Sequence, residues 1–130
     1  MEIVIDTAAL LAVLLEEPER RALIAATRGA LLVAPGSLPW EVGNALVAAV
    51  RRRRLTVTQA QAGWAAYATV PIRLVDVDIG REFALSVECG LYAYDAYMLE
   101  LARSRGLPLL TLDARLSEAA PLAGVALVEV

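Results

Sequence analysis

Residues 1–10 read Met-Glu-Ile-Val-Ile-Asp-Thr-Ala-Ala-Leu, and this stretch decides the expected fold. Residues 3–5 (Ile-Val-Ile) form a short apolar run that is typical of a strand buried on both faces of a parallel sheet. Asp6 and Thr7 follow directly, and residues 8–15 then have the composition of an apolar helix. Open α/β sheets form their binding sites at the carboxyl ends of the strands. Asp6 therefore stands where a site residue is expected, provided that other acids converge on it.

The composition favours a single cytoplasmic domain over residues 1–130. Hydrophobic residues make up 58% of the chain, but the longest apolar run, residues 8–15, is shorter than the roughly 20 residues of a membrane span. Asp6 interrupts the apolar stretch that a secretion signal would need. Cys89 is the only cysteine, so an internal disulfide and a multi-cysteine zinc site are excluded. We expect no membrane association, and we expect the apolar excess to serve a homodimer interface or a protein partner.

The chain contains no histidine and no lysine, and all 12 of its basic residues are arginine. This excludes Ser-His-Asp and Cys-His catalysis, histidine-ligated metals, P-loop nucleotide binding and lysine Schiff bases. Carboxylates, hydroxyls and arginines remain for chemistry. The net charge of −3 is unusual for a protein that binds nucleic acid. If four acids held metal, however, the rest of the chain would be slightly basic.

Strand-like and helix-like segments alternate along the whole chain, which predicts a mainly parallel sheet with helices on both faces. Thr58 and Gln61 have capping-box spacing, and Asp78 precedes another helix as a cap. The expected strands cover residues 3–5, 31–34, 72–77, 109–112 and 125–130. The expected helices cover residues 8–15, 18–28, 38–53, 58–70, 79–88, 95–105 and a short segment after Asp113 that is broken at Pro121.

Asp6 and Asp113 each follow an apolar run directly, so both lie at the carboxyl end of a strand and at the same edge of a parallel sheet. Aspartate is also a good helix N-cap, and each of these residues precedes a predicted helix. A cap and a metal ligand are compatible, so both interpretations stay open for these two residues.

Glu41 and Asp95 lie early in two of the predicted helices. Glu41 follows Ser37 by four residues, which misses the capping-box spacing, and it lies on the shoulder of the apolar face of its helix. Asp95 shares a helical stripe with Met98 and other apolar residues, so it faces inward and needs a partner. The alternatives are a solvated glutamate for Glu41 and an N-cap for Asp95.

A single pocket that contains Asp6, Glu41, Asp95 and Asp113 would require a cation, because clustered carboxylates repel one another. Oxygen ligands without histidine or thiolate select Mg²⁺ or Mn²⁺ rather than zinc. Such a site can activate water and bind phosphate oxygens, which is the equipment for phosphodiester hydrolysis.

The order of these motifs resembles the PIN-domain ribonucleases, and in particular the VapC-type toxins of bacterial toxin–antitoxin pairs. The resemblance spans nearly the whole chain. It is carried by residues 4–10 (Val-Ile-Asp-Thr-Ala-Ala-Leu), 39–46 (Pro-Trp-Glu-Val-Gly-Asn-Ala-Leu), 94–97 (Tyr-Asp-Ala-Tyr) with 101–102 (Leu-Ala), and 108–116 (Pro-Leu-Leu-Thr-Leu-Asp-Ala-Arg-Leu).

The resemblance implies a three-layer α/β sandwich around a five-stranded parallel sheet in the order 3-2-1-4-5. It also implies Mg²⁺- or Mn²⁺-dependent endonucleolytic cleavage of RNA, with a cognate antitoxin protein as inhibitor. By this likeness, Asp6, Glu41, Asp95 and Asp113 hold the metal, while Thr7 and Thr111 support the site.

Other features have two interpretations each. Arg51 and Arg52, in the basic run 51–54, could bind RNA phosphates or simply end a helix in solvent. Tyr92, Tyr94 and Tyr97 could stack on bases or pack between helices. The apolar helix 8–15 could form a dimer interface, a groove for an antitoxin helix or part of the core. A housekeeping RNA-processing PIN nuclease and a non-catalytic PIN-like interaction module are the rival functions.

Overall fold

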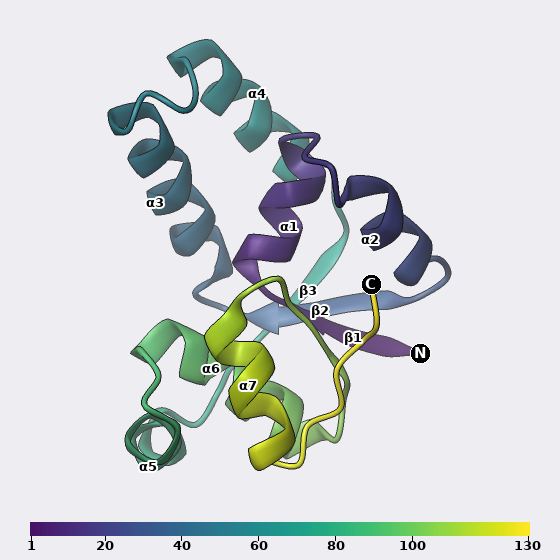
Figure 1. Ribbon diagram of the computed structural model, residues 1–130, viewed down its shortest axis with the longest axis vertical. Helices are drawn as coiled ribbons and strands as arrows, with labels where there is room; N and C mark the ends of the chain where they lie inside the picture. The colour runs from purple at the N-terminus through teal and green to yellow at the C-terminus, as the bar shows by residue number, and fades with distance from the viewer.

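The computed structural model describes residues 1–130 and forms three layers, with a parallel sheet between two groups of helices (Figure 1). The sheet has four strands in the order β3-β2-β1-β4. Their bounds are Glu2–Ile5 (β1), Leu31–Pro35 (β2), Ile72–Val75 (β3) and Leu109–Leu110 (β4). The predicted fold class and strand order are therefore confirmed, with one strand fewer than expected.

The helices divide between the two faces of the sheet. The helices α1 to α4 lie on one side and α5 to α7 on the other (Figure 1). Their bounds are Thr7–Leu14 (α1), Arg20–Ala26 (α2), Leu38–Arg51 (α3), Val57–Tyr67 (α4), Ile79–Cys89 (α5), Ala93–Arg105 (α6) and Ala114–Leu122 (α7). None of these helices has the length and apolar character that crossing a membrane requires.

The register of the sheet places two site residues side by side. Ile5 of β1 pairs with Leu110 of β4 in a parallel ladder, and Asp6 N–H donates to the Leu110 carbonyl at 3.1 Å. Because the two strands end level with each other, Asp6 and Thr111 leave the sheet at the same edge. This is the carboxyl edge between β1 and β4, where strand order reverses.

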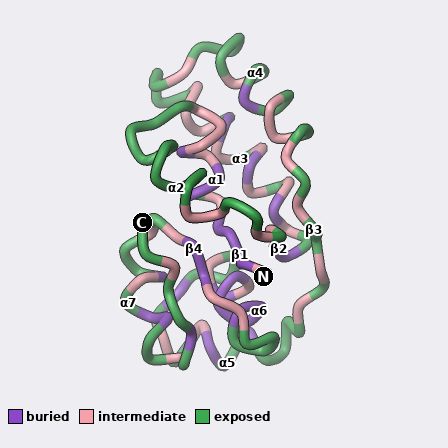
Figure 2. Tube along the Cα trace, turned by 90° about the vertical axis from the view of Figure 1, so that its right-hand side faces the viewer, coloured by how far each residue is buried: buried purple, intermediate pink, exposed green.

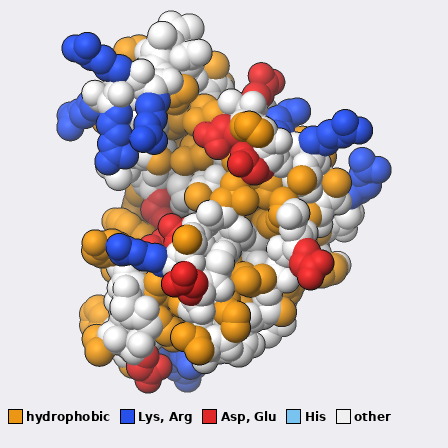
Figure 3. Space-filling model, in the orientation of Figure 1, with side chains coloured by type: hydrophobic (Ala, Val, Ile, Leu, Met, Phe, Trp, Pro, Cys, Tyr) orange, Lys and Arg blue, Asp and Glu red, His pale blue; other side chains and the backbone are white.

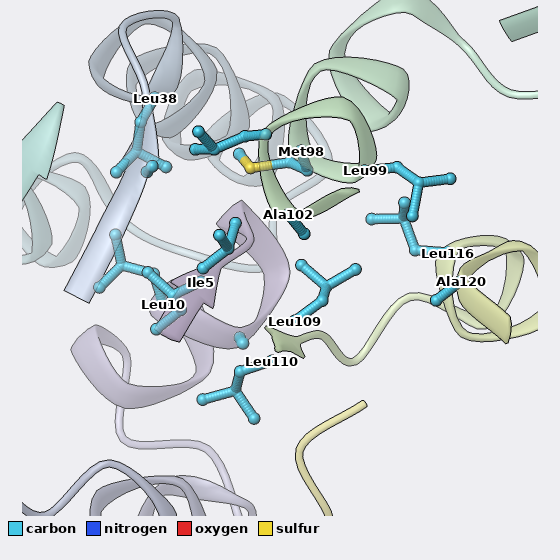
Figure 4. Packing of buried hydrophobic residues seen from close by; sticks show 14 of the residues in the cluster. Ile5, Leu10, Leu38, Met98, Leu99, Ala102, Leu109, Leu110, Leu116 and Ala120 are labelled. Atoms are coloured by element: carbon cyan, nitrogen blue, oxygen red, sulfur yellow. The ribbon is translucent and has the colours of Figure 1, made fainter. Parts of the chain in front are cut away.

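The core is one cluster of buried apolar side chains that joins the sheet to both helix layers. Figure 2 shows buried residues following the strands and the inner sides of the helices, with exposed residues on the outer helices. In Figure 4, Met98 and Ala102 of α6 lie near Ile5 and Leu109, and Leu99 lies next to Leu116 of α7. Burying such side chains is worth about 1.5–3 kcal/mol each, so α6 and the strands that position the acids are held firmly together.

The segment predicted as a fifth strand, residues 125–130, makes only a single parallel bridge, between Leu127 and Leu109. Leu109 N–H donates to the Ala126 carbonyl at 2.9 Å, and Val128 N–H donates to the Leu109 carbonyl at 2.9 Å. The tail therefore lies next to β4, in the predicted place, but β4 is too short to pair with more of it.

Several predicted element bounds were wrong by a few residues. The helix predicted from residue 18 begins at Arg20, the helix predicted to end at residue 53 ends at Arg51, and the strand predicted to end at residue 77 ends at Val75. Pro121 lies inside the last turn of α7 and does not break it.

The capping box of α4 is formed by Thr56 and Gln59, so the predicted pair Thr58 and Gln61 was wrong. Gln59 N–H donates to Thr56 Oγ1 at 3.1 Å, and Thr56 N–H donates to Gln59 Oε1 at 2.9 Å. Both pairs have the same three-residue spacing. The first pair is used because Thr56 has the extended backbone that an N-cap needs.

Candidate active site

Asp6 occupies the centre of the site and is nearly inaccessible, with 3% of its surface exposed. One carboxylate oxygen accepts from Ala9 N–H at 2.8 Å and so caps α1. The other oxygen accepts from the hydroxyl of Thr111. Thr111 Oγ1 also accepts from Asp113 N–H at 2.9 Å, so one threonine links two of the predicted acids. Asp6 is therefore both a helix cap and a fixed carboxylate of the site.

Glu41 projects from the first turn of α3 and is held by two hydroxyl groups. Thr7 Oγ1 donates to one carboxylate oxygen at 3.1 Å, and Ser37 Oγ donates to the other at 2.8 Å. The solvated alternative for Glu41 is thus wrong, because the side chain is half-buried and oriented toward the strand edge. Thr7 lies beside the site as predicted, whereas Ser37 was not predicted as a site residue.

Asp95 lies in the first turn of α6 and does not cap it. The helix begins at Ala93, two residues earlier than expected, and Tyr92 occupies the cap position. The N-cap alternative for Asp95 is therefore wrong. Asp113 does cap α7, because Leu116 N–H donates to its Oδ1 at 2.9 Å. Asp113 thus has a structural role as the cap of its helix, whereas the half-buried Asp95 has no such role.

The four predicted acids share one cavity. It has a volume of about 240 Å³, and its lining includes Asp6, Glu41, Asp95 and Asp113, together with Thr7, Ala8, Leu11, Ala45 and Met98. Figure 3 shows acidic side chains in a hollow between the upper and lower halves of the molecule. The sequence-based prediction that these four carboxylates approach one another agrees with this geometry.

The electrostatics of the cavity disfavour ionised carboxylates. Burial, together with the charges of Asp113 and Asp95, raises the pKa of Asp6 from 3.8 to about 6, although bonds from Thr111 and Ala9 oppose the shift. Burial also raises the pKa of Glu41 and of Asp95. These acids would lose their mutual repulsion if a cation were bound among them.

The donor set fits a hard divalent cation, because every available ligand is a carboxylate or hydroxyl oxygen. No group of three or more acids is arranged closely enough to hold one ion together. Mg²⁺ is usually bound through one or two carboxylates with several waters, so a closed cage is not required. The residues therefore fit Mg²⁺ or Mn²⁺ and do not fit zinc, which prefers histidine and thiolate.

The predicted phosphate ligands Arg51 and Arg52 lie away from this cavity. They follow Glu41 by 10 and 11 residues along α3 and its end, which corresponds to about 15 Å of helix. Basic side chains gather at this end of the molecule, at the upper left of Figure 3. A nearer cation is Arg115, whose charge acts on Asp95 and whose guanidinium lies 5.3 Å from the centre of the Tyr92 ring. Its position two residues after Asp113 was the signal that could have identified it.

The sequence matches the family model described as PIN domain over residues 3–122. The chain belongs to the PIN domain family. No curated protein matches the sequence of this PIN domain.

Solved structures show the same fold. The PIN domain is similar to PAE2754 from Pyrobaculum aerophilum, with a TM-score of 0.72 and 23% identity over 98% of this chain and 84% of that one. It is similar to VapBC2 from Rickettsia felis, bound to a DNA fragment from its promoter, with a TM-score of 0.66 and 12% identity over 98% and 97% of the chains. It is also similar to VapC20 from Mycobacterium tuberculosis, described as a Sarcin-Ricin loop cleaving toxin, with a TM-score of 0.63 and 16% identity over 90% and 94%.

Proposed function

We propose that this PIN domain is a metal-dependent endoribonuclease and acts as the toxin of a type II toxin–antitoxin system. The observation that carries the proposal is the cavity that Asp6, Glu41, Asp95 and Asp113 line together. Family membership supports a nuclease, and the fold shared with two Vap proteins supports the toxin role.

In this proposal the four acids hold Mg²⁺ or Mn²⁺ and are the catalytic residues. The ion, when bound, neutralises the acids and the scissile phosphate and makes a water molecule a better nucleophile. The hydroxyl of Thr111 fixes Asp6, and those of Thr7 and Ser37 fix Glu41, so these carboxylates keep their orientation. Acids fixed in this way need little reorganisation during the reaction.

A non-catalytic interaction module, in which the acids only cap helices, explains fewer of the observations. Asp6 and Asp113 do cap α1 and α7. Asp95 caps no helix, and Glu41 is bound by hydroxyl groups instead of backbone amides. Two half-buried acids that cap no helix favour a site that uses them.

RNA cleavage tests the proposal directly. Purified protein should cut RNA with Mg²⁺ or Mn²⁺ and stop when a chelator is added. Asp95→Asn should abolish cleavage, while Asp78→Asn, which changes an exposed cap on α5, should not. If RNA stays intact in the presence of metal, or if Asp95→Asn cuts as well as the parent, the nuclease proposal is wrong.

The toxin role predicts growth arrest on expression, relieved by the product of a neighbouring small gene. Growth without arrest would favour a housekeeping RNA-processing nuclease. We propose that the antitoxin binds the groove of about 510 Å³ between α1 and α3. Leu11 of α1 and Leu15, which follows α1, line this groove, and so do Arg52 and Arg54, which follow α3. Leu11 and Leu15 are half-buried, whereas Leu10 of α1 is buried in the core, so the apolar sequence of this segment serves both the core and the groove.

The remaining assignments belong to the same proposal. We expect a single cytoplasmic domain without membrane association. We also expect a homodimer, and light scattering of the purified protein measures the molar mass that tests it. Cys89 is unpaired, which suits a reducing compartment. Arg51 and Arg52 would bind phosphates of RNA that extends beyond the cavity.

A further inference from the structure

A second cleft adjoins the acidic cavity and differs from it in chemistry. It has a volume of about 510 Å³ and is lined by Thr7, Trp40, Glu41, Asn44, Tyr92, Tyr94 and Asp95. Thr7, Glu41 and Asp95 also line the acidic cavity, so the two spaces adjoin at these three side chains. An RNA phosphate bound at the acids would therefore lie next to this cleft.

Three large aromatic side chains are exposed in the cleft. Trp40 is 73% exposed, Tyr92 is 71% exposed and Tyr94 is 50% exposed. They come from the start of α3 and from the entry into α6, so the fold brings them together across the site. Scattered exposed apolar residues are normal, but a cluster beside a site indicates a binding surface. The helix-packing alternative does not explain Tyr92, which is mostly in solvent. It explains Tyr94 only in part, because the Tyr94 ring contacts the Tyr97 ring edge-on and still leaves 50% of Tyr94 exposed.

The polar groups of the cleft suit a nucleotide. Asn44 carries both donors and an acceptor, which can pair with the edge of a base. Arg115 lies over Tyr92 at 5.3 Å from its ring centre and supplies a positive charge next to the acids. Flat aromatic faces, an amide and an arginine are the groups by which proteins bind unpaired bases and their phosphates.

We propose that this aromatic cleft is a nucleobase subsite, which holds an unpaired base of RNA next to the phosphate that is cut. The inference rests on the proposed ribonuclease function and adds to it the side chains that hold a base beside the scissile phosphate. Bases in an A-form duplex are stacked on their neighbours, and its major groove is too deep and narrow for side chains to read. Only an unpaired base can place its face against Trp40 or Tyr94.

Two tryptophans in the chain allow a direct optical test. Trp40 lies in the cleft, whereas Trp64 lies on α4 and stacks on Tyr67, with ring centres 5.2 Å apart. Trp64→Phe leaves Trp40 as the only tryptophan, and Trp40→Phe leaves Trp64. In an Asp6→Asn background, which prevents cleavage, a short unstructured RNA oligonucleotide should quench the emission of Trp40 and leave that of Trp64 unchanged.

A coupling experiment tests stacking itself. Tyr94→Ala should weaken binding of the oligonucleotide about tenfold, the effect typical of one lost base–aromatic stack. Tyr94→Phe should retain the affinity, and so should Phe83→Ala, which removes an exposed aromatic residue of α5 outside the cleft. Replacing one nucleotide at a time by an abasic one should cause a similar loss at one position only. When Tyr94→Ala is combined with the abasic nucleotide at that position, the affinity should fall no further than with either change alone.

Three results would overturn the inference. The first is an equal response of both tryptophans to RNA, and the second is an affinity that no abasic position changes. The third is a change in Trp40 emission with protein concentration in the absence of RNA, because a second copy of the chain would then cover the cleft. Failure of the ribonuclease proposal looks different, since wild-type protein would then leave RNA intact even where the oligonucleotide binds through a stacked base.

Discussion

Replacing Asp6 by Asn should stabilise the metal-free protein at neutral pH. The Asp6 side chain is 3% exposed, and its pKa is raised from 3.8 to about 6. Because the folded state favours the neutral form, the stability that this form contributes is present below pH 3.8 and is lost as the pH rises through about 6. Ionised Asp6 thus destabilises the fold by about 3 kcal/mol at neutral pH, at 1.36 kcal/mol per pKa unit.

Asparagine keeps the shape of the side chain, can still accept from Ala9 N–H and carries no charge. The stability of Asp6→Asn relative to wild type should therefore rise between about pH 4 and pH 6 and stay level above that range. Denaturant unfolding in the presence of a chelator, repeated across this pH range, measures the difference in the free energy of unfolding. In thermal unfolding the same difference corresponds to a Tm shift of about 10 °C. Asp6→Asn also changes the hydrogen bonds of this side chain, but that contribution is the same at every pH. The change with pH in the stability difference between Asp6→Asn and wild type therefore reports the charge alone.

Metal provides the complementary measurement. Mg²⁺ should stabilise the wild type, by about 3 kcal/mol at a hundredfold excess over its dissociation constant, and should not stabilise Asp6→Asn. Asp78→Asn, which also removes a carboxylate at a helix N-cap but on the surface, should be stabilised by Mg²⁺ as much as the wild type. A relative stability of Asp6→Asn that stays constant or falls as the pH rises would refute the electrostatic reasoning.

The remaining predictions concern single contacts. Thr111→Val should cost about 1–3 kcal/mol in denaturant unfolding, because it removes both side-chain hydrogen bonds of a half-buried hydroxyl, and it should weaken Mg²⁺ binding in calorimetry. Thr56→Ala should cost about 1 kcal/mol by loss of the α4 cap, whereas Thr58→Ala should be nearly neutral; equal losses would contradict the capping box of the structure. Arg115→Gln should weaken RNA binding. It should also make the slope of log affinity against log salt concentration shallower by about one unit. An unchanged salt dependence would mean that this arginine binds no phosphate.

The sequence was sufficient for the central part of the site because local rules act there. An apolar run followed by an aspartate identified both Asp6, directly after β1, and Asp113, three residues after β4, and parallel pairing brought these two strand ends together. Helical spacing placed Glu41 on the shoulder of the apolar face of α3, which favoured a site role and left a solvated side chain as the alternative. These inferences need only the spacing of apolar residues along a helix and the direction of a strand. Both can be read from neighbouring residues in the sequence, without knowledge of distant contacts.

The parts that were wrong depend on choices between equivalent local patterns. Thr56 and Thr58 each have a glutamine three residues later, and the sequence does not distinguish them. The start of α6 was placed at Asp95 because Tyr92 and Ala93 have no capping signature. The strand predicted over residues 109–112 ends at Leu110, because Thr111 turns its hydroxyl to Asp6 and to Asp113 N–H. Tertiary contacts decided each of these cases.

Arg115, Ser37, Trp40 and Asn44 were missed as parts of the site for a related reason, whereas base stacking by Tyr92 and Tyr94 was one of two predicted alternatives. Ser37 entered the sequence argument only as the residue four positions before Glu41, and its bond to Glu41 depends on how the chain turns out of β2. The cleft combines residues of α3 with residues before and in α6, and only the packing of these helices across the sheet edge brings them together.

The short strand β4 has a consequence for how this edge of the sheet opens. Two residues of β4 are held by β1 on one side and, on the other, by a single bridge to the tail that ends the chain. Leu109 and Leu110 are fully buried, so β4 itself stays in the core, but most of the tail beside it is exposed, and such segments open locally far more often than the whole protein unfolds. When the tail frays, β4 is paired on one side only, while β1, β2 and the bonds of Thr111 stay intact. Amide hydrogen exchange should therefore report opening at Leu109 and Val128, whose N–H groups bond across this edge, well below the energy of global unfolding, and a bound partner that covers the edge would slow it.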